Sequence, residues 1–311
     1  MSAIVTSLLD LIGHTPLLEP VRYQRQEQYG ARLLLKLECC NPLHSVKDRV
    51  ALGMILDAEQ TGQLHPGDVL IEPTGGSAGI SLAFVGRVKG YRVILTMPDT
   101  VGNERVMLLR ALGAEVVLTP GYLGMKGAIH KAEELAESIS GAYSPRQFEN
   151  PANPDIHRHT TAQEILQDTD GRIDLFVAGV GTGGTLTGIA EVLREHNPSM
   201  QVIAVEPTDS AVLSGGKSGA HRLAGIGAGF APPVLNREAY DEVMTVRTDE
   251  AYEACRALAH TEALLLGASS GAALHAATQL ARRAENRGKT IVAIMPDTGE
   301  RYLTSGLFEA F

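Results

Sequence analysis

Short strands rich in Val, Ile and Leu alternate with amphipathic helices along most of this 311-residue chain. Alternation at this spacing predicts parallel strands, because a parallel neighbour is reached through a crossover that a helix usually supplies. We therefore expect an α/β fold with twisted, mostly parallel sheets that helices cover on both faces. The expected strands are 68–74, 91–98, 114–120, 172–179, 200–207, 242–247 and 290–297, and the clearest helices are 45–62, 77–90, 124–141 and 185–196.

Length and turn signals together indicate two domains. A chain of 311 residues is longer than most single domains and can bury a sizeable core. The rigid, turn-rich segment NPANP at 150–154 is typical of a crossover between domains.

The composition excludes several classes of function. The formal net charge is -9 and no basic stripe occurs, so nucleic acid is not an expected partner. We expect no membrane span, because no run of about 18 apolar residues is present, and the N-terminus lacks the basic leader of a signal peptide. Cys39, Cys40 and Cys255 have the spacing of neither a disulfide framework nor a zinc site, which favours reduced thiols in a cytoplasmic protein without a metal centre.

The segment VAGVGTGGT at 177–185 joins an expected strand to an expected helix through four glycines. Such a loop offers backbone N–H groups and the positive end of a helix to an anion. Gly179, Gly181 and Gly184 follow the order of a dinucleotide-binding loop, and Glu206 lies where a ribose-binding acid would be expected. Against NAD, the continuation TGGT suits a single enclosed phosphate, and Pro207 turns the chain directly after Glu206.

Three further motifs carry candidate chemistry. Lys47 in NPLHSVKDR lies near a helix start, where the dipole disfavours an ammonium group; it is either a Schiff-base lysine or a solvated lysine paired with Asp48. EPTGGSAG at 72–79 is either a second anion loop or a tight turn with Ser77 as the N-cap. In GASSGAA at 267–273, Ser269 or Ser270 either caps a helix or contacts a ring nitrogen.

Two anion loops, one lysine and one serine fit pyridoxal phosphate. This cofactor needs a lysine for its aldehyde, a cup for one phosphate and a partner for its pyridine nitrogen. A neutral serine partner leaves the ring a weaker electron sink than a carboxylate partner would. The combination therefore favours β-elimination and β-replacement over transamination.

In this order, NPLHSVKDR, EPTGG, GVGTGGT, GIGAGF and GASSGAA resemble segments of the cysteine synthases (O-acetylserine sulfhydrylases), which are fold-type II pyridoxal phosphate enzymes related to cystathionine β-synthase. The resemblance extends from IGHTP at 12–16 to GERYL at 299–303. It implies two three-layer domains of the tryptophan synthase β-like type. A smaller, mobile substrate domain is expected at 42–150, and a larger cofactor-phosphate domain at 1–41 and 151–311.

The resemblance also implies a role for each matching residue. Lys47 would form the internal aldimine and act as the general base at the substrate α-carbon, and Ser269 would face the pyridine nitrogen. Gly225 would border the active site. The cofactor phosphate would be held by Gly181, Thr182, Gly183, Gly184 and Thr185. The substrate α-carboxylate would be bound by Thr74, Gly75, Gly76 and Ser77 with help from Gln147, and Ser77 would also contact the cofactor.

The reaction implied is β-replacement on an activated serine such as O-acetylserine, through an aminoacrylate, with sulfide as the nucleophile and L-cysteine as the product. The family's carboxylate loop usually reads T-S/N-G-N-T-G, whereas this chain has TGGSAG, and the Gln that often precedes GIGAGF is Ala224. These departures leave another donor or nucleophile open, such as O-phosphoserine, homocysteine or an amine.

Other classes remain as alternatives at this point. A serine or threonine dehydratase would use the same cofactor, an oxidoreductase would bind NAD at Gly179–Gly184, and a non-catalytic amino-acid sensor would retain only the scaffold. The resemblance further implies a homodimer. It also implies serine acetyltransferase as a partner, although the altered carboxylate loop argues against that complex.

Overall fold

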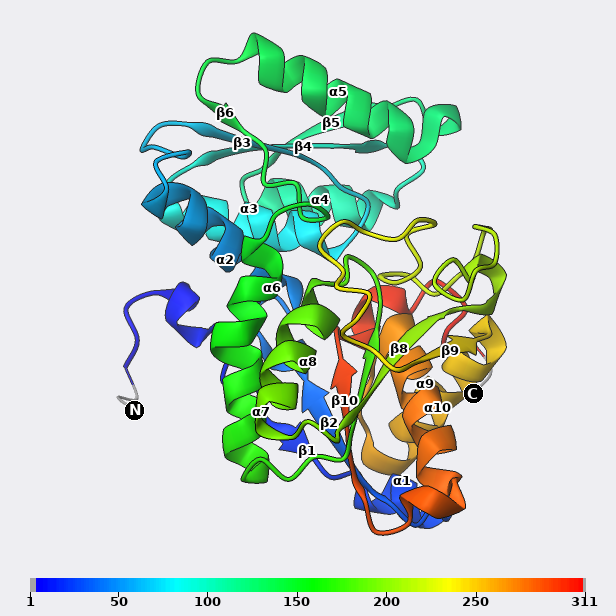
Figure 1. Cartoon of the computed structure of the whole chain (residues 1–311). Helices are drawn as coiled ribbons and strands as arrows, with labels where there is room; N and C mark the ends of the chain where they lie inside the picture. The colour runs from blue at the N-terminus through cyan, green and yellow to red at the C-terminus, as the bar shows by residue number, and fades with distance from the viewer. Residues whose placement is uncertain (1–3, 310–311) are drawn as a thin grey trace. The chain divides into compact units, whose positions relative to one another are not determined.

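Two sheets organise the chain in the computed structural model, which describes residues 4–309 (Figure 1). Residues 4–12 and 47–153 form unit 1, and residues 13–46 and 154–309 form unit 2. Each unit has its own sheet with helices on both faces. The expected α/β fold with mostly parallel sheets is confirmed.

Unit 1 is built on a four-stranded sheet in the order β5-β4-β3-β6, in which all pairs are parallel. Figure 1 shows α5 on one face of this sheet and α2, α3 and α4 on the other. The elements are η1 (Leu8–Leu11), α2 (Lys47–Gln60), β3 (Val69–Pro73), α3 (Ser77–Lys89), β4 (Arg92–Pro98), α4 (Asn103–Ala111), β5 (Glu115–Thr119), η3 (Gly121–Leu123), α5 (Gly124–Ser138) and β6 (Ala142–Tyr143).

Unit 2 is built on a six-stranded sheet in the order β1-β2-β10-β7-β8-β9, in which only the β1–β2 pair is antiparallel. The strands are β1 (Leu17–Leu18), β2 (Arg32–Leu37), β7 (Leu175–Gly179), β8 (Gln201–Pro207), β9 (Glu242–Val246) and β10 (Thr290–Met295). The helices are α1 (Val21–Glu27), α7 (Ala162–Thr169), α8 (Gly184–His196), α9 (Thr248–Glu262) and α10 (Ala268–Arg282). Short 3-10 helices lie at η2 (Glu38–Cys40), η5 (Thr208–Ser210), η6 (Ala284–Asn286) and η7 (Gly299–Tyr302). The helix α6 (Ala152–Ile156) spans the boundary between the units and continues into the π-helix η4 (His157–Thr161).

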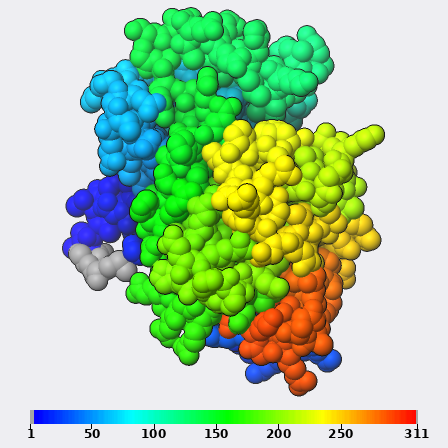
Figure 2. Space-filling model, viewed as in Figure 1, coloured from blue at the N-terminus to red at the C-terminus, as the bar shows by residue number. Residues whose placement is uncertain are grey.

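Apolar side chains fill both sides of the unit 2 sheet. The central strands β7 and β10 are buried almost throughout, as expected for parallel strands covered on two faces. Helices α1, α9 and α10 pack on one face, and α7 and α8 pack on the other (Figure 1). The connection from β8 to β9, residues 208–241, forms the lime-to-yellow surface visible in Figure 2.

The units divide the chain at places that differ slightly from the domain limits expected at 42 and 150. Val46 N–H donates to Pro296 O (2.8 Å), and Thr298 N–H donates to His44 O (3.2 Å), so the segment before Lys47 is held by unit 2. Residues 4–12 fall in unit 1 rather than in the larger unit, because η1 packs against α3.

Several elements were not assigned from the sequence. The strand β2 lies in RLLLKL, which has no alternation that separates it from a buried helix turn. The strands β1 and β6 have only two residues each, and α1 and α6 have seven and five residues. Elements this short carry little periodicity.

Helices α9 and α10 approach closely at Gly271, and this contact generates the first prediction. A Cβ at Gly271 would overlap the carbonyl oxygen of Ala251 and press against Cys255. We expect Gly271→Ala to lower the free energy of unfolding by about 1–3 kcal/mol, because overpacking forces backbone shifts. Urea titration followed by circular dichroism measures the change. Gly102→Ala is the matched control, because nothing lies within 4 Å of a Cβ there; equal losses in both variants would contradict the packing argument.

Candidate active site

The loop from Gly181 to Thr185 connects β7 to α8, and glycine is required at two of its positions. A Cβ at Gly181 would overlap the carbonyl oxygen of Gly225. Gly183 has a φ of 86° and would place a Cβ 2.6 Å from Cβ of Leu235. The N–H of Gly184 faces Oγ1 of Thr182 at 3.4 Å. The backbone therefore lies closer to its neighbours than any side chain would allow, and a loop of this kind at a helix N-terminus is typical of anion sites.

Buried His157 contacts this loop, although no motif in the sequence predicts the contact. Its Nε2 lies 3.2 Å from Oγ1 of Thr185, and its Nδ1 lies 2.9 Å from Oγ1 of Thr161. His157 begins the π-helix η4, a rare conformation that often marks functional sites. The local sequence PDIHRHTT carries no signal for a π-helix, so only the three-dimensional structure shows the contact.

Gly225 and Ser269 lie next to each other in unit 2. Gly225 has a φ of 95°, and a Cβ there would lie 3.4 Å from Oγ of Ser269. Ser269 is buried in the first turn of α10, whose N-cap is Gly267. Neither Ser269 nor Ser270 is the N-cap, so the capping interpretation of these serines is wrong. A neutral hydroxyl therefore stands beside the glycine that follows Ala224.

The second glycine loop follows β3 in unit 1 and leads into α3. Oγ1 of Thr74 accepts from the N–H of Gly79 (3.0 Å) and faces the N–H of Gly76 at 3.4 Å. Nη1 of Arg105, in α4, donates to the carbonyl oxygen of Gly75. The N-cap of α3 is Gly76, so the interpretation of Ser77 as N-cap is wrong. Thr74 thus fixes the backbone of this loop from within the loop, and Arg105 fixes it from the neighbouring helix α4.

Lys47 is the first residue of α2, at the point where unit 1 begins. The preceding segment is held in unit 2 by the Ser45–Asp297 bridge and by Nη2 of Arg301, which donates to Leu43 O. Asp48, next to Lys47, is buried and accepts from Oγ of Ser81 (2.6 Å). Lys47 therefore directly follows a segment anchored in unit 2 and is the first residue of a helix of unit 1.

The predicted residues fall into two sets, one on each unit. Unit 2 brings together the loop Gly181–Thr185, Gly225 and Ser269. Unit 1 carries Lys47, the loop Thr74–Ser77, and Gln147, whose carbonyl oxygen accepts from Nδ2 of Asn153 (2.7 Å). Within residues 4–309, no three His, Cys, Asp or Glu side chains gather as a metal site would require.

Glu206 does not have the surroundings that a ribose-binding acid needs. Its buried carboxylate accepts from the N–H of Leu213 (2.8 Å), the N–H of Ser214 (2.9 Å) and Oγ of Ser214 (2.6 Å). These donors come from the loop that follows η5. Glu206 thus holds its own connection in place, and the feature on which the NAD interpretation depended has another explanation.

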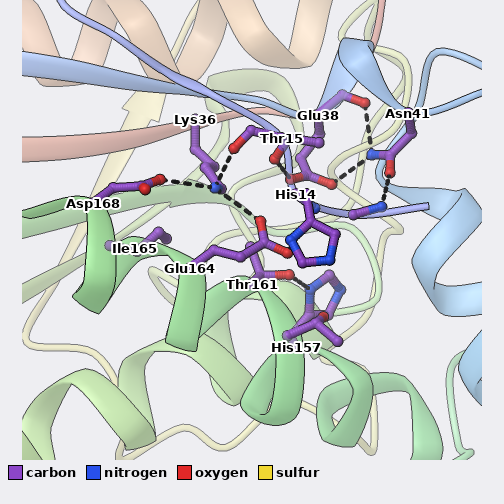
Figure 3. A network of polar contacts seen from close by, with 12 residues as sticks. His14, Thr15, Lys36, Glu38, Asn41, His157, Thr161, Glu164, Ile165 and Asp168 are labelled. Carbon is purple, nitrogen blue, oxygen red and sulfur yellow. Dashed lines mark hydrogen bonds and ion pairs between the residues drawn. The ribbon is translucent and has the colours of Figure 1, made fainter. Parts of the chain in front are cut away.

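A buried polar network supports the segments that lead into this site (Figure 3). Lys36, which has no exposed surface, pairs with Glu164 (2.9 Å) and Asp168 (3.5 Å) on α7 and donates to Thr15 O. Buried Glu38 accepts from Oγ1 of Thr15 (2.7 Å) and Nδ2 of Asn41 (2.8 Å). Oδ1 of Asn41 in turn accepts from the N–H of Gly13 (2.9 Å).

The thiols of Cys39 and Cys255 are poor nucleophiles. Burial is the main cause that raises the pKa of Cys39 and of Cys255 to about 12, so both thiols are protonated at neutral pH.

Within the part of the chain that the structure describes, no helix is long and apolar enough to cross a bilayer.

The residues present fit pyridoxal phosphate. The loop Gly181–Thr185 lies at the N-terminus of α8 and has glycines where no side chain fits, which suits binding of one phosphate by the backbone. Buried Ser269 offers the neutral hydroxyl that a pyridine nitrogen would meet. The protein family described as "Pyridoxal-phosphate dependent enzyme" matches residues 8–297 of this chain. The chain belongs to this family of pyridoxal-phosphate-dependent enzymes, of fold type II.

Individual relatives carry more specific names. A protein named cysteine synthase from Staphylococcus aureus is 50% identical over 305 residues, which cover 98% of this chain and 97% of that protein. A cysteine synthase structure from Entamoeba histolytica has a TM-score of 0.97 and 43% identity, and covers 100% of this chain and 92% of that one. An O-ureido-L-serine synthase structure has a TM-score of 0.94 and 44% identity, and covers 99% and 96%. The expected resemblance to the cysteine synthases is confirmed.

The buried Lys36 pair generates a stability prediction. We expect Lys36→Met to lower the free energy of unfolding by about 3–5 kcal/mol, because it leaves the carboxylate of Glu164 without its buried cation. Arg172→Met is the control, since Arg172 pairs with Asp170 with side chains 81% and 78% exposed, and exposed pairs contribute at most about 1 kcal/mol. Thermal unfolding of both variants measures the difference. A loss for Lys36→Met no larger than for Arg172→Met would refute the role of the network.

Proposed function

We propose that this protein catalyses β-replacement on O-acetylserine with sulfide and forms L-cysteine and acetate. The observation that carries the proposal is the donor set of unit 2: a glycine loop for one phosphate beside a neutral serine hydroxyl. Full-length similarity to proteins named cysteine synthase supports the choice of donor and nucleophile. When bound, pyridoxal phosphate supplies an electron sink for negative charge at the substrate α-carbon.

The residues of this chain divide the work between two units. In unit 2, the loop Gly181–Thr185 would hold the phosphate and Ser269 would hydrogen-bond the pyridine nitrogen, while Gly225 would leave space beside it. In unit 1, the loop Thr74–Ser77 and Gln147 would bind and orient the substrate α-carboxylate. Lys47 would hold the cofactor aldehyde before substrate binds, and its freed amine would then take the proton from the substrate α-carbon. It would return a proton there after acetate has left and sulfide has added at the β-carbon.

The same proposal covers the wider organisation. Unit 1 would act as the smaller, mobile substrate domain and unit 2 as the larger cofactor-phosphate domain. A homodimer and a cytoplasmic location remain predictions from the family resemblance. Serine acetyltransferase stays a weaker candidate partner, because the carboxylate loop that its C-terminal tail would meet is altered here.

A second candidate differs only in the nucleophile. The carboxylate loop has Gly75, Ser77 and Ala78 where the family usually has longer polar side chains, and Ala224 replaces a usual Gln. One structure of 44% identity is named O-ureido-L-serine synthase, so a close relative carries a name other than cysteine synthase. Smaller side chains near the substrate would accommodate a nucleophile larger than sulfide.

Substitution of Lys47 tests the catalytic assignment. We expect Lys47→Ala to lower the rate of cysteine formation by at least about 100-fold, because it removes both the covalent anchor and the α-proton base. Mass spectrometry of borohydride-treated protein should locate the cofactor on Lys47 in the wild type only. Lys89→Ala is the control, since Lys89 pairs with Glu59 (2.7 Å) and has no role in the proposed site. Full turnover by Lys47→Ala would exclude the assignment.

A panel of substrates separates the two candidates. With O-acetylserine as donor, we expect kcat/KM for sulfide to exceed that for homocysteine or a small amine by at least about tenfold, a factor that corresponds to about 1.4 kcal/mol. Replacing O-acetylserine by O-phosphoserine tests the leaving group, and L-serine alone with a keto-acid assay tests the dehydratase. A preference for homocysteine or the amine would replace the first candidate by the second.

A further inference from the structure

Glu72 is a buried carboxyl group that the proposed reaction does not use. It lies on β3, two residues before Thr74, and only 4% of its surface is exposed. A buried carboxyl group is costly unless it is hydrogen-bonded, so its partners indicate what it does.

Within residues 4–309, the hydrogen-bond donors to the side chain of Glu72 come from one short segment of unit 1. Its Oε2 accepts from Oγ of Ser144 (3.1 Å) and from the N–H of Arg146 (3.2 Å). The N–H of Gln147 lies near the same carboxylate and favours its ionised form. Glu72 therefore accepts hydrogen bonds from two of the four residues from 144 to 147, and it lies near a third.

The contacts with Glu72 hold the chain just beyond the last backbone pair between β6 and β3. β6 pairs with β3 at only two positions, Val69 with Ala142 and Leu70 with Tyr143. Beyond Tyr143 the chain leaves the sheet, and Arg146 adopts a left-handed conformation with a φ of 49°. A residue other than glycine rarely adopts this conformation, so the surrounding structure must maintain it. The Glu72 carboxylate supplies the acceptor that a continuing strand would otherwise have supplied.

The backbone of Gln147 is held on both sides. Its N–H faces Glu72, and its carbonyl oxygen accepts from Nδ2 of Asn153 (2.7 Å). Its side-chain Oε1 is buried, and within the described residues it has no hydrogen-bond partner. The segment is thus fixed through its main chain, while the side-chain amide also carries an NH2 group, the donor that a substrate carboxylate would require.

We propose that Glu72 is a positioning residue that ties the segment 144–147 to the end of β3 and so places Gln147 beside the carboxylate-binding loop Thr74–Ser77. This inference rests on the proposed function, because it needs a substrate carboxylate at that loop. Glu72 touches neither substrate nor cofactor and acts through Gln147.

Kinetics of single and double variants test this role. Burial is the main cause that raises the pKa of Glu72 to about 7, so the assays are made at pH 8, where the carboxylate is ionised. We expect Glu72→Gln to raise KM for O-acetylserine about tenfold, with kcat within about threefold, because the lost contact supports substrate binding. Gln147→Ala should have a similar effect. The double variant should be no worse than Gln147→Ala alone, since Glu72 acts through that residue.

A general structural effect would give a different result. The proposal would be overturned if the rise in KM of the double variant equalled the product of the two single rises. A fall in kcat as large as the rise in KM would also overturn it. Glu115→Gln is the matched control, because Glu115 lies on the edge strand β5 of the same sheet and pairs with Arg92 (2.6 Å). It should leave KM unchanged.

Hydrogen exchange tests the same contact without any turnover. In the holoenzyme, the amides of Arg146 and Gln147 should exchange at least about tenfold faster in Glu72→Gln than in the wild type or in Glu115→Gln, because their acceptor is weakened. Unchanged exchange would overturn the proposal. If the wild type fails to convert O-acetylserine, the proposed function fails, and the exchange rates still decide whether Glu72 holds the segment.

Discussion

Parallel pairing is the constraint on which the rest of this structure depends. In a parallel sheet the carboxyl ends of the strands meet at one edge, and ligands bind in the loops beyond that edge. The glycine loop at Gly181–Thr185 follows β7, the loop at Thr74–Ser77 follows β3, and the segment with Gln147 follows β6. The groups that the proposed reaction needs are therefore brought to two sheet edges by topology, although they are far apart in the sequence.

Glycine and buried polar groups then fix these loops in different ways. In unit 2, the loop is defined by close backbone approach, since Gly181 lies against Gly225 and no side chain fits between them. In unit 1, the loop is defined by side chains that bond the backbone, such as Thr74 and Arg105. A loop of the first kind resists substitution because of its shape. A loop of the second kind depends on residues that never touch the ligand.

Local sequence patterns predict much of this architecture. Features that depend on contacts between residues distant in the sequence could not be predicted. The strands that become β3, β4, β7 and β8 and the glycine loops are signalled within about ten residues of sequence, because periodicity and backbone freedom are local properties. The strand β2 was missed because RLLLKL has no alternation, and the contact of His157 with Thr185 joins residues 28 apart. The capping roles given to Ser77 and Ser269 failed because glycines one and two residues earlier take the N-cap.

On the proposed function, the sequence of the loop Thr74–Ser77 changes which residues matter for binding the substrate carboxylate. With Gly75, Ser77 and Ala78 in place of longer polar side chains, an anion at this loop depends mainly on backbone N–H groups. Side-chain donors can adjust to a ligand through their rotamers, whereas backbone donors are as well placed as the backbone itself. Under this proposal, affinity would depend on the contacts that hold the main chain, which are made by Thr74 within the loop, by Arg105 at Gly75, and by Glu72 at the neighbouring segment. In a loop with few polar side chains, binding specificity would therefore be determined by the residues that hold the loop's main chain in position.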